Sequence, residues 1–290
     1  MVLTHEFSYI GDKIYISAEI TLTLNIYFIA ACFFALLPIL YALSVSFDGE
    51  GSLLSSSFSL FPRHFSLANY KAVFTEEPVL LWAGNTLILV SFTVLLSLGA
   101  SIPAAYVFSR WKFPGRKGIL KALLLLYSFP SILSMFALYK LMSSLSLVNT
   151  RIGLVLRYSG TMAVFSLWNM KGYFDTIPVE IEEAAAMDGC RDHMIVTKIV
   201  MPLARPSIIV TATMVLNYVW NEYIFSLNFL VGSDNMTLAG GLYSLQATEM
   251  SGSWPVFAAA SIVVSIPVLA IFFASQKHMV SGLSSGGVKG

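Results

Sequence analysis

Charged residues are scarce in this sequence of 290 residues. Asp, Glu, Lys and Arg make up 11% of it, whereas soluble domains carry about 25%. Hydrophobic residues make up 57%, and the mean hydropathy is +0.76. One water-soluble core cannot hold that much apolar surface. The composition therefore excludes an ordinary soluble domain and indicates that a lipid bilayer is the solvent.

Residues that carry metal, redox or covalent chemistry are also few. The two cysteines, Cys32 and Cys190, lie far apart in the sequence and give no information about disulfides. The four histidines lack the spacing of metal ligands, and no GxxxxGK[ST] phosphate loop is present. No Ser/His/Asp grouping stands out. We therefore expect no catalytic site, no metal and no cofactor in this chain, and a net charge of +1 gives no reason to expect a nucleic-acid partner.

What the sequence does contain is long apolar runs. A helix needs about 20 apolar residues to cross the hydrocarbon core of a bilayer. Six runs qualify, at residues 22–43, 83–108, 119–141, 152–170, 208–231 and 256–274. Prolines within them are tolerable because neighbouring helices and hydroxyl side chains can satisfy the freed carbonyls. The sequence thus predicts an all-α membrane protein with six transmembrane helices.

Basic residues predict how these helices are oriented. Most of the 17 lysines and arginines lie in or next to two connections, 109–118 and 171–205, or precede the first run or follow the last one. Because cytoplasmic loops carry an excess of Lys and Arg, both termini are expected in the cytoplasm. The chain then divides into a cytoplasmic segment 1–21, a six-helix domain 22–280 and a cytoplasmic tail 281–290.

The connection 171–205 is long and carries its own helix signals. Thr176 is a candidate N-cap, Pro178 fits the first turn, and Gly189 supplies a stop with positive φ. Between them lie acidic residues suited to a helix N-terminus and then strong helix formers: Glu180, Glu182, Glu183, Ala184, Ala185 and Ala186. A second helix is expected over residues 192–200, ended by Pro202 and Pro206.

Two interpretations of this helical loop follow from its composition. An interfacial helix that rests on lipid normally borders its apolar face with Lys and Arg. The first arm here is instead acidic and alanine-rich, and a smooth alanine surface lets another protein approach the backbone closely. Docking onto a protein is the interpretation that the composition favours.

A specific motif agrees with docking. Glu183-Ala184-Ala185, Gly189, then Ile199 and Pro202 resemble the EAA loop of binding-protein-dependent ABC importers, with Met201 where the family pattern has leucine. The resemblance implies a cytoplasmic coupling helix between helices four and five, seated in a cleft of an ATP-binding subunit. The residues that it implicates in coupling are Glu182, Glu183, Ala184, Ala185, Ala186, Asp188, Gly189, Ile199 and Pro202.

The resemblance extends over most of the chain. Residues 168–174, 220–223 and 282–290 look like those of carbohydrate-importer permeases, most of all the smaller permease subunit of maltose/maltodextrin importers. This implies a second, non-identical permease subunit, a homodimeric ATP-binding subunit that holds ATP and Mg, and an extracytoplasmic sugar-binding protein. It also implies that a tail formed by Gly286, Gly287, Val288 and Lys289 contacts the ATPase.

Polar and aromatic residues at membrane depth are candidates for a substrate pathway. They are Asn217, Trp220, Asn221, Glu222 and Tyr127. Buried polar groups tend to face the interior of a helix bundle, where they can bind sugar hydroxyls or simply link helices. Helix linking is the slightly favoured interpretation, since the larger partner of such importers supplies most of the sugar site. Pro130 predicts a kink, either a gate hinge or a packing feature, and packing is favoured.

Two further alternatives remain open. The external loop 232–255, which has no basic residue, resembles a loop that reaches toward the binding protein, but it also reads as an ordinary connection. The chain as a whole could be an ion-coupled secondary transporter or channel that acts without an ATPase. Such a carrier would show paired charges inside the membrane, and only Glu222 and Arg157 approach that description.

Overall fold

The computed structural model describes residues 5–9, 12–16, 18–49, 60–248 and 254–287. The chain forms two compact units. The first comprises residues 1–72 and 249–262, and the second comprises residues 73–248 and 263–290. Each unit is described by itself.

The first unit contains the N-terminal elements. Strands β1 (His5–Tyr9) and β2 (Asp12–Ile16) pair antiparallel and precede α1 (Ala18–Ser46). Sequence reasoning did not foresee this hairpin in an otherwise helical chain. With 29 residues, α1 is about 43 Å long, enough to cross a bilayer. Asn69, in α2 (Ala68–Thr75), closes the turn after α1 by donating its amide to the carbonyls of Ser46 and Asp48.

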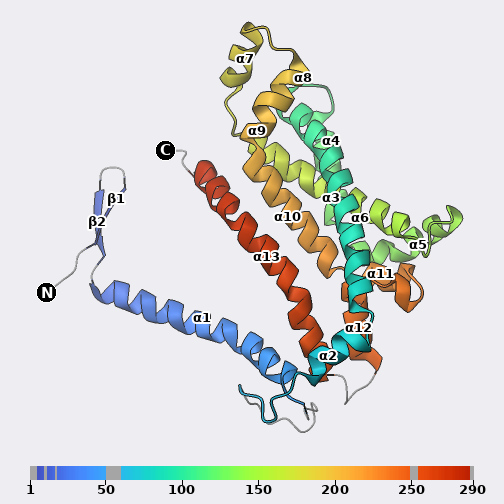
Figure 1. Ribbon diagram of the computed structural model, residues 1–290. Coiled ribbons are helices and arrows are strands. Elements are labelled where there is room, and N and C mark those ends of the chain that lie inside the picture. The colour runs from blue at the N-terminus through green and yellow to red at the C-terminus, as the bar shows by residue number, and fades with distance from the viewer. Residues whose placement is uncertain (1–4, 10–11, 17, 50–59, 249–253, 288–290) are drawn as a thin grey trace. The chain divides into compact units, whose positions relative to one another are not determined.

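The second unit is built on three helices that pack side by side (Figure 1). They are α3 (Val79–Arg110), α6 (Arg151–Phe174) and α10 (Arg205–Asn221). The shorter elements are α4 (Arg116–Ser128), the 3₁₀ turn η1 (Ser131–Ser134), α5 (Met135–Ser144), α7 (Val179–Met187), α8 (Asp192–Ile195), the π-helical η2 (Val196–Val200), α9 (Met201–Leu203), α11 (Ile224–Phe229), the 3₁₀ turn η3 (Ser233–Asn235) and α12 (Leu238–Thr248). Helix α13 (Trp254–Gly287) runs from the first unit into the second.

Small residues, most of them polar, form the contact face of α3. Thr93, Ser97, Ser101 and Ala105 recur every four residues on one side of the helix, and all are at most 1% exposed. Large apolar residues lie on the other side, where Leu95 is 68% exposed. Small residues inside and large apolar residues outside are typical of helices that pack closely within lipid.

Three described helices are long and apolar enough to cross a membrane: α1, α3 and α13. They coincide with the runs 22–43, 83–108 and 256–274. Two bent helix pairs raise the number to at most five. Helix α6 covers the run 152–170 and has 24 residues, but its mean hydropathy keeps it outside this apolar set.

Two of the expected runs are interrupted, which corrects the sequence prediction. Run 119–141 breaks at Phe129–Pro130, where α4 and the helices that follow meet at 86°. Run 208–231 breaks after Asn221, because Glu222 takes an extended conformation before α11 begins. A proline and an extended residue each stop the helical hydrogen-bond ladder, so neither run is one straight span.

Candidate functional site

Helix α7, the first arm of the 171–205 connection, has sharply defined ends. Gly189 has φ +85°, which lies in the left-handed region. The amide of Gly189 donates to the carbonyl of Ala186, and the amide of Cys190 donates to the carbonyl of Ala185. This pair of bonds is a Schellman cap. At the other end the sequence prediction is wrong: the helix begins at Val179, so Pro178 takes the capping position, while the hydroxyl of Thr176 donates to the carbonyl of Tyr173.

The second arm continues through α8, η2 and α9 as one succession of helical turns. Pro202 does not end it but lies in the first turn of α9, and Pro206 lies in the first turn of α10. Proline is tolerated there because the first amides of a helix have no intrahelical partner. The chain instead turns at Ala204, where the two helical stretches meet at 73°.

Glu182 fastens α7 to the end of α3. One of its carboxylate oxygens accepts from Nε of Arg110 at 2.7 Å, and the other accepts from the hydroxyl of Tyr106 at 2.7 Å. Arg110 also donates to the carbonyl of Ile177 at 3.0 Å, and Ile177 lies in the segment that leads into α7. Both charged side chains are about nine-tenths buried. A charge-assisted pair with this many bonds fixes orientation as well as position.

An apolar cluster supports the same joint. Its buried members come from α3, α4, α6 and both arms of the connection: Ala105, Leu120, Leu167, Met170, Phe174, Ile177, Ala185, Ile195, Val200 and Ala204. Ile199 packs against the cluster. The connection is therefore a packed extension of the helices, and displacement of α7 has to displace the ends of α3 and α6 with it.

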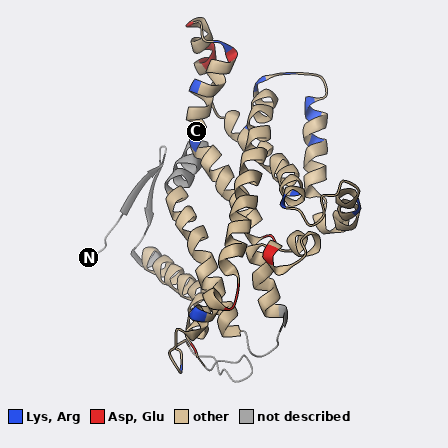
Figure 2. Ribbon diagram, turned by 45° about the vertical axis from the view of Figure 1, so that its right-hand side comes forward, with Lys and Arg blue, Asp and Glu red and all other residues tan. Residues whose placement is uncertain are grey.

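The outer face of α7 is exposed to solvent in the part of the chain that the structure describes. Glu183, Ala184, Ala186, Met187 and Asp188 are exposed, and Met187 is 88% exposed. Only Glu182 and Ala185 point inward. Figure 1 shows α7 and α8 beyond the end of α10, and Figure 2 shows acidic and basic residues together on them. An exposed, small-residue surface on a rigid base is suited to receiving a partner.

Asp175, just after α6, adds a second link between the ends of α3 and α6. Burial alone would raise the pKa of its carboxyl. The hydrogen bonds from Lys171 and Ser109 and the charges of Lys171 and Arg116 outweigh burial, so the pKa lies below its usual value. Asp175 is therefore ionised at neutral pH.

A cavity of about 350 Å³ lies at the two helix breaks. It is lined by Ser131, Ile132, Tyr218, Asn221, Glu222, Tyr223, Ile224 and Phe225. Irregular backbone at membrane depth is tolerated where it lines a cavity, because polar groups there can be satisfied without lipid contact. Both breaks border the same space, and Ser131 and Ile132, which follow the Pro130 kink, line it.

A polar network stands behind this cavity. Glu222 accepts from the hydroxyl of Tyr158, which is fully buried, and from the amide of Phe225 at 2.8 Å. Arg157, 6% exposed, donates to the hydroxyl of Tyr218 at 2.5 Å and lies 3.6 Å from the ring centroid of Phe225. Among the described residues Arg157 and Glu222 form no ion pair with each other. Tyrosines and an aromatic face stabilise the two charges instead.

The other residues expected in the pathway are placed differently. Asn217 and Asn221 share a face and are joined by hydrogen bonds, and both are exposed. Trp220 is 4% exposed and packs inside the unit, away from the cavity lining. Tyr127 lies outside the lining and contacts the ring of Phe165. Of the five, Asn221 and Glu222 line the cavity.

The loop 232–255, expected outside the membrane, is held by hydrogen bonds where the structure describes it. The indole of Trp82 donates to the carbonyl of Ser233, and the amide of Asn85 donates to the carbonyls of Asp234 and Met236. The hydroxyl of Thr86 accepts from the amide of Leu238. Part of the loop lies outside the described residues, as do Val288 and Lys289 of the tail, while Gly286 and Gly287 end α13.

The family model described as the binding-protein-dependent transport system inner membrane component matches residues 97–284, which include both the α7 joint and the cavity. The chain belongs to this family. It is a membrane-embedded permease with the fold of ABC importer permeases, as the EAA resemblance predicted.

Similar proteins agree along nearly the whole chain. The permease is 35% identical over 256 residues to the galactooligosaccharides transport system permease protein GanQ of Bacillus subtilis, covering 87% of this chain and 90% of GanQ. It is 32% identical over 282 residues to the maltose/maltodextrin transport system permease protein MalG of Salmonella typhimurium, covering 91% and 93%. A crystal structure of a bacterial ABC transporter that imports alginate matches with a TM-score of 0.75 at 24% identity, covering 89% and 95%.

Sequence reasoning missed several residues of the site. Tyr106 was seen only as part of an apolar run, Arg110 only as a basic residue that orients the helices, and Tyr158 and Tyr218 as ordinary members of spans. A basic residue at the end of α3 is a signal for orientation, but its partner lies 72 residues away in the sequence. Only the folded chain brings the two together.

Proposed function

We propose that this permease is one transmembrane subunit of an ATP-driven ABC importer for a di- or oligosaccharide. Its partners are a second, non-identical permease subunit, a homodimeric ATP-binding subunit that holds ATP and Mg, and an extracytoplasmic sugar-binding protein. Both termini and α7 face the cytoplasm. The observation that carries the proposal is that the exposed face of α7 is tied by Glu182 and Arg110 to a helix of the membrane domain.

The mechanism follows from that joint. When the ATPase subunits close, a partner seated on Ala184, Met187 and Asp188 moves α7. The Glu182–Arg110 pair and the apolar cluster pass the displacement to α3 and α6. Helix α10 runs from Arg205 beside this joint to Asn221 at the cavity, so the same displacement reaches the cavity wall.

The cavity supports a sugar as the substrate. It combines hydrogen-bonding groups on Ser131, Asn221 and Glu222 with the rings of Tyr218, Tyr223 and Phe225. Sugars present hydroxyl edges and apolar faces, which such a lining can match. The relatives named for maltodextrins and galactooligosaccharides favour a maltose/maltodextrin or similar oligosaccharide, trehalose included.

Site-specific cross-linking tests this proposal. Met187→Cys in a variant carrying Cys32→Ser and Cys190→Ala places one thiol on the exposed face of α7. In membranes that contain the whole transporter, a short reagent with one thiol-reactive end and one amine-reactive end is expected to join it to an amine of the ATPase subunit. Val231→Cys, 66% exposed at the other end of the unit, is the matched control and is expected to give no such product.

The rival, an ion-coupled carrier that needs no ATPase, predicts a different result. In that case the purified chain alone would move sugar into vesicles along an ion gradient, and Met187→Cys would yield no cross-link to an ATPase. Either observation would overturn the subunit assignment.

A further inference from the structure

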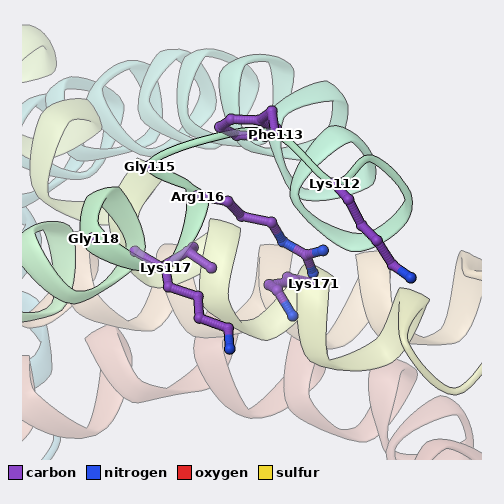
Figure 3. Close-up of a pocket in the computed structure, with 8 residues that line it drawn as sticks. Lys112, Phe113, Gly115, Arg116, Lys117, Gly118 and Lys171 are labelled. Carbon is purple, nitrogen blue, oxygen red and sulfur yellow. The ribbon is translucent and has the colours of Figure 1, made fainter.

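A second cavity, of about 800 Å³, lies where α3, α4 and α6 approach the 111–115 connection (Figure 3). It is lined by Lys112, Phe113, Gly115, Arg116, Lys117, Gly118, Leu120 and Lys171. Four of these residues are basic and none is acidic. The figure shows Lys112 on the connection, Arg116 and Lys117 at the start of α4 and Lys171 on α6, each with nitrogen at its free end.

One of the four basic residues is paired, because Lys171 forms an ion pair with Asp175. Among the described residues, Lys112, Arg116 and Lys117 form no ion pair with a carboxylate, although the charge of Arg116 also acts on Asp175. Cations that line one cavity repel each other, and an anion in the cavity relieves that repulsion.

The backbone at the start of α4 adds to the positive electrostatic potential of the cavity. Helix α4 begins at Arg116 behind Gly115, which has φ +84°, and no side chain caps its N-terminus. The first amides of a helix carry a partial positive charge and bind phosphate groups readily. Two residues of this first turn, Lys117 and Gly118, line the cavity.

The cavity also has apolar walls and lies just beyond the end of a helix that is able to span a bilayer. Phe113 and Leu120 line it, and α3, which ends at Arg110 just before it, is one of the helices able to span a bilayer. A free phosphate ion gains nothing from contact with apolar walls, whereas a phospholipid can place its acyl chains against them. Basic pockets between membrane helices on the cytoplasmic side are a recognised setting for anionic headgroups.

We infer that this cavity binds the phosphodiester headgroup of an anionic phospholipid from the cytoplasmic leaflet. The inference rests on the proposed orientation, in which α7 and the 111–115 connection face the cytoplasm. Arg116 and Lys117 hold the phosphate together with the amides of Lys117 and Gly118, and Lys112 closes over it from the connection. The site lies beside the Lys171–Asp175 link, so a bound lipid braces the ends of α3 and α6 next to the α7 joint.

Native mass spectrometry of the full-length chain, with the subunits that co-purify with it, tests the inference. The delipidated protein is titrated with palmitoyl-oleoyl phosphatidylglycerol, with palmitoyl-oleoyl phosphatidylcholine and with inorganic phosphate in separate arms. Phosphatidylglycerol adducts are expected to persist at low concentration, and the other two probes to bind far more weakly.

The variant Lys112→Gln, Arg116→Gln, Lys117→Gln removes the three cations of the cavity that form no ion pair. Each cation near an anionic surface is worth about fivefold in affinity, so phosphatidylglycerol binding is expected to weaken roughly a hundredfold. The matched control Lys121→Gln, Lys140→Gln, Lys198→Gln removes three exposed lysines outside the cavity and is expected to keep wild-type binding.

Three results would overturn the inference. They are equal binding of both lipids, binding of inorganic phosphate without the lipid, and equal loss in the two triple variants. A cavity variant that binds the lipid normally but no longer holds the ATPase would assign the cations to a protein surface instead. None of these results affects the Met187→Cys cross-link, so failure of the lipid site and failure of the proposed function are distinguishable.

Discussion

Glu182 accepts hydrogen bonds from two side chains of α3, one charged and one neutral. Its neighbour Glu183 is exposed and free to face a partner. The two adjacent glutamates therefore have different roles. Glu182 fixes α7 to its own chain, and the exposed side chain of Glu183 can contact a partner protein. The motif singles out both as coupling residues, but only burial separates the two roles.

Replacing Glu182 by Gln tests the inward role. The amide keeps one acceptor but loses the charge, which leaves Arg110 nine-tenths buried without a counter-ion. Loss of a charged hydrogen-bond partner typically costs about 1–3 kcal/mol. We expect ATP hydrolysis in the reconstituted transporter to continue while sugar uptake per ATP falls severalfold. The control Glu180→Gln, on the exposed side of α7, should transport normally; equal uptake in both variants would refute the anchoring role.

Gly189 provides a second test at residue scale. A Cβ there meets no atom within 4 Å, so Gly189→Ala is opposed only by the left-handed backbone, at about 1–2 kcal/mol. We expect faster hydrogen exchange at the amides of Gly189 and Cys190 as the Schellman cap opens. Gly160→Ala, also with open space but within α6, should leave exchange slow. Unchanged exchange in Gly189→Ala would show that the cap does not depend on glycine.

At the scale of elements, the connection between α11 and α12 is held against the start of α3. The Trp82 indole donates to the carbonyl of Ser233 in this connection. Its ring also contacts Gly241 in α12, where an added Cβ would lie 2.1 Å from a ring atom. Glycine is required at this position because a ring occupies the space that a side chain would need.

Gly241→Ala is therefore expected to destabilise the protein. Overpacking a filled site costs roughly 1–3 kcal/mol, which should lower the midpoint of thermal unfolding in detergent by several degrees. Gly84→Ala, on α3 with no atom within 4 Å of its Cβ, is the control. The double variant Trp82→Leu, Gly241→Ala should recover part of the loss relative to Trp82→Leu alone. If the two changes add without coupling, the contact is not the cause.

The same elements show what the sequence could predict. Helices α1, α3 and α13 follow from unbroken apolar runs, because a run of that length has few other ways to bury its backbone. The cap at Gly189 follows from local chemistry. The breaks at Phe129–Pro130 and Glu222 do not, because a proline can merely kink a helix, and an extended Glu222 depends on Tyr158, 64 residues away. The pairing of Arg110 with Glu182 is likewise tertiary.

At the scale of the molecule, the second unit places its two candidate sites at opposite ends of the same helices. Helix α10 leads from the α7 connection to the cavity, and with 17 residues it is about 25 Å long. Helix α6 carries Arg157 and Tyr158 near the cavity and Phe174 in the cluster beneath α7. Rigid helices that share both sites provide a direct mechanical route between them, in which a discrete rearrangement at one end biases the other.

Tyr158→Phe tests whether the cavity end of this route governs transport. The change removes only the hydroxyl that donates to Glu222, so this carboxylate keeps the amide of Phe225 but loses its buried partner. A hydrogen bond to a charged group is worth about 1.5–3 kcal/mol, so the wall of the cavity should be held less firmly in one arrangement. With the binding protein, the ATPase and a labelled oligosaccharide that the binding protein accepts in proteoliposomes, we expect the maximal uptake rate to fall about tenfold or more while the ATPase stays bound. Tyr139→Phe, which alters an exposed hydroxyl on α5, is the matched control and should transport as the wild type does. Equal rates for the two variants would mean that the Tyr158–Glu222 pair only links helices, and the substrate pathway would have to lie elsewhere in the transporter.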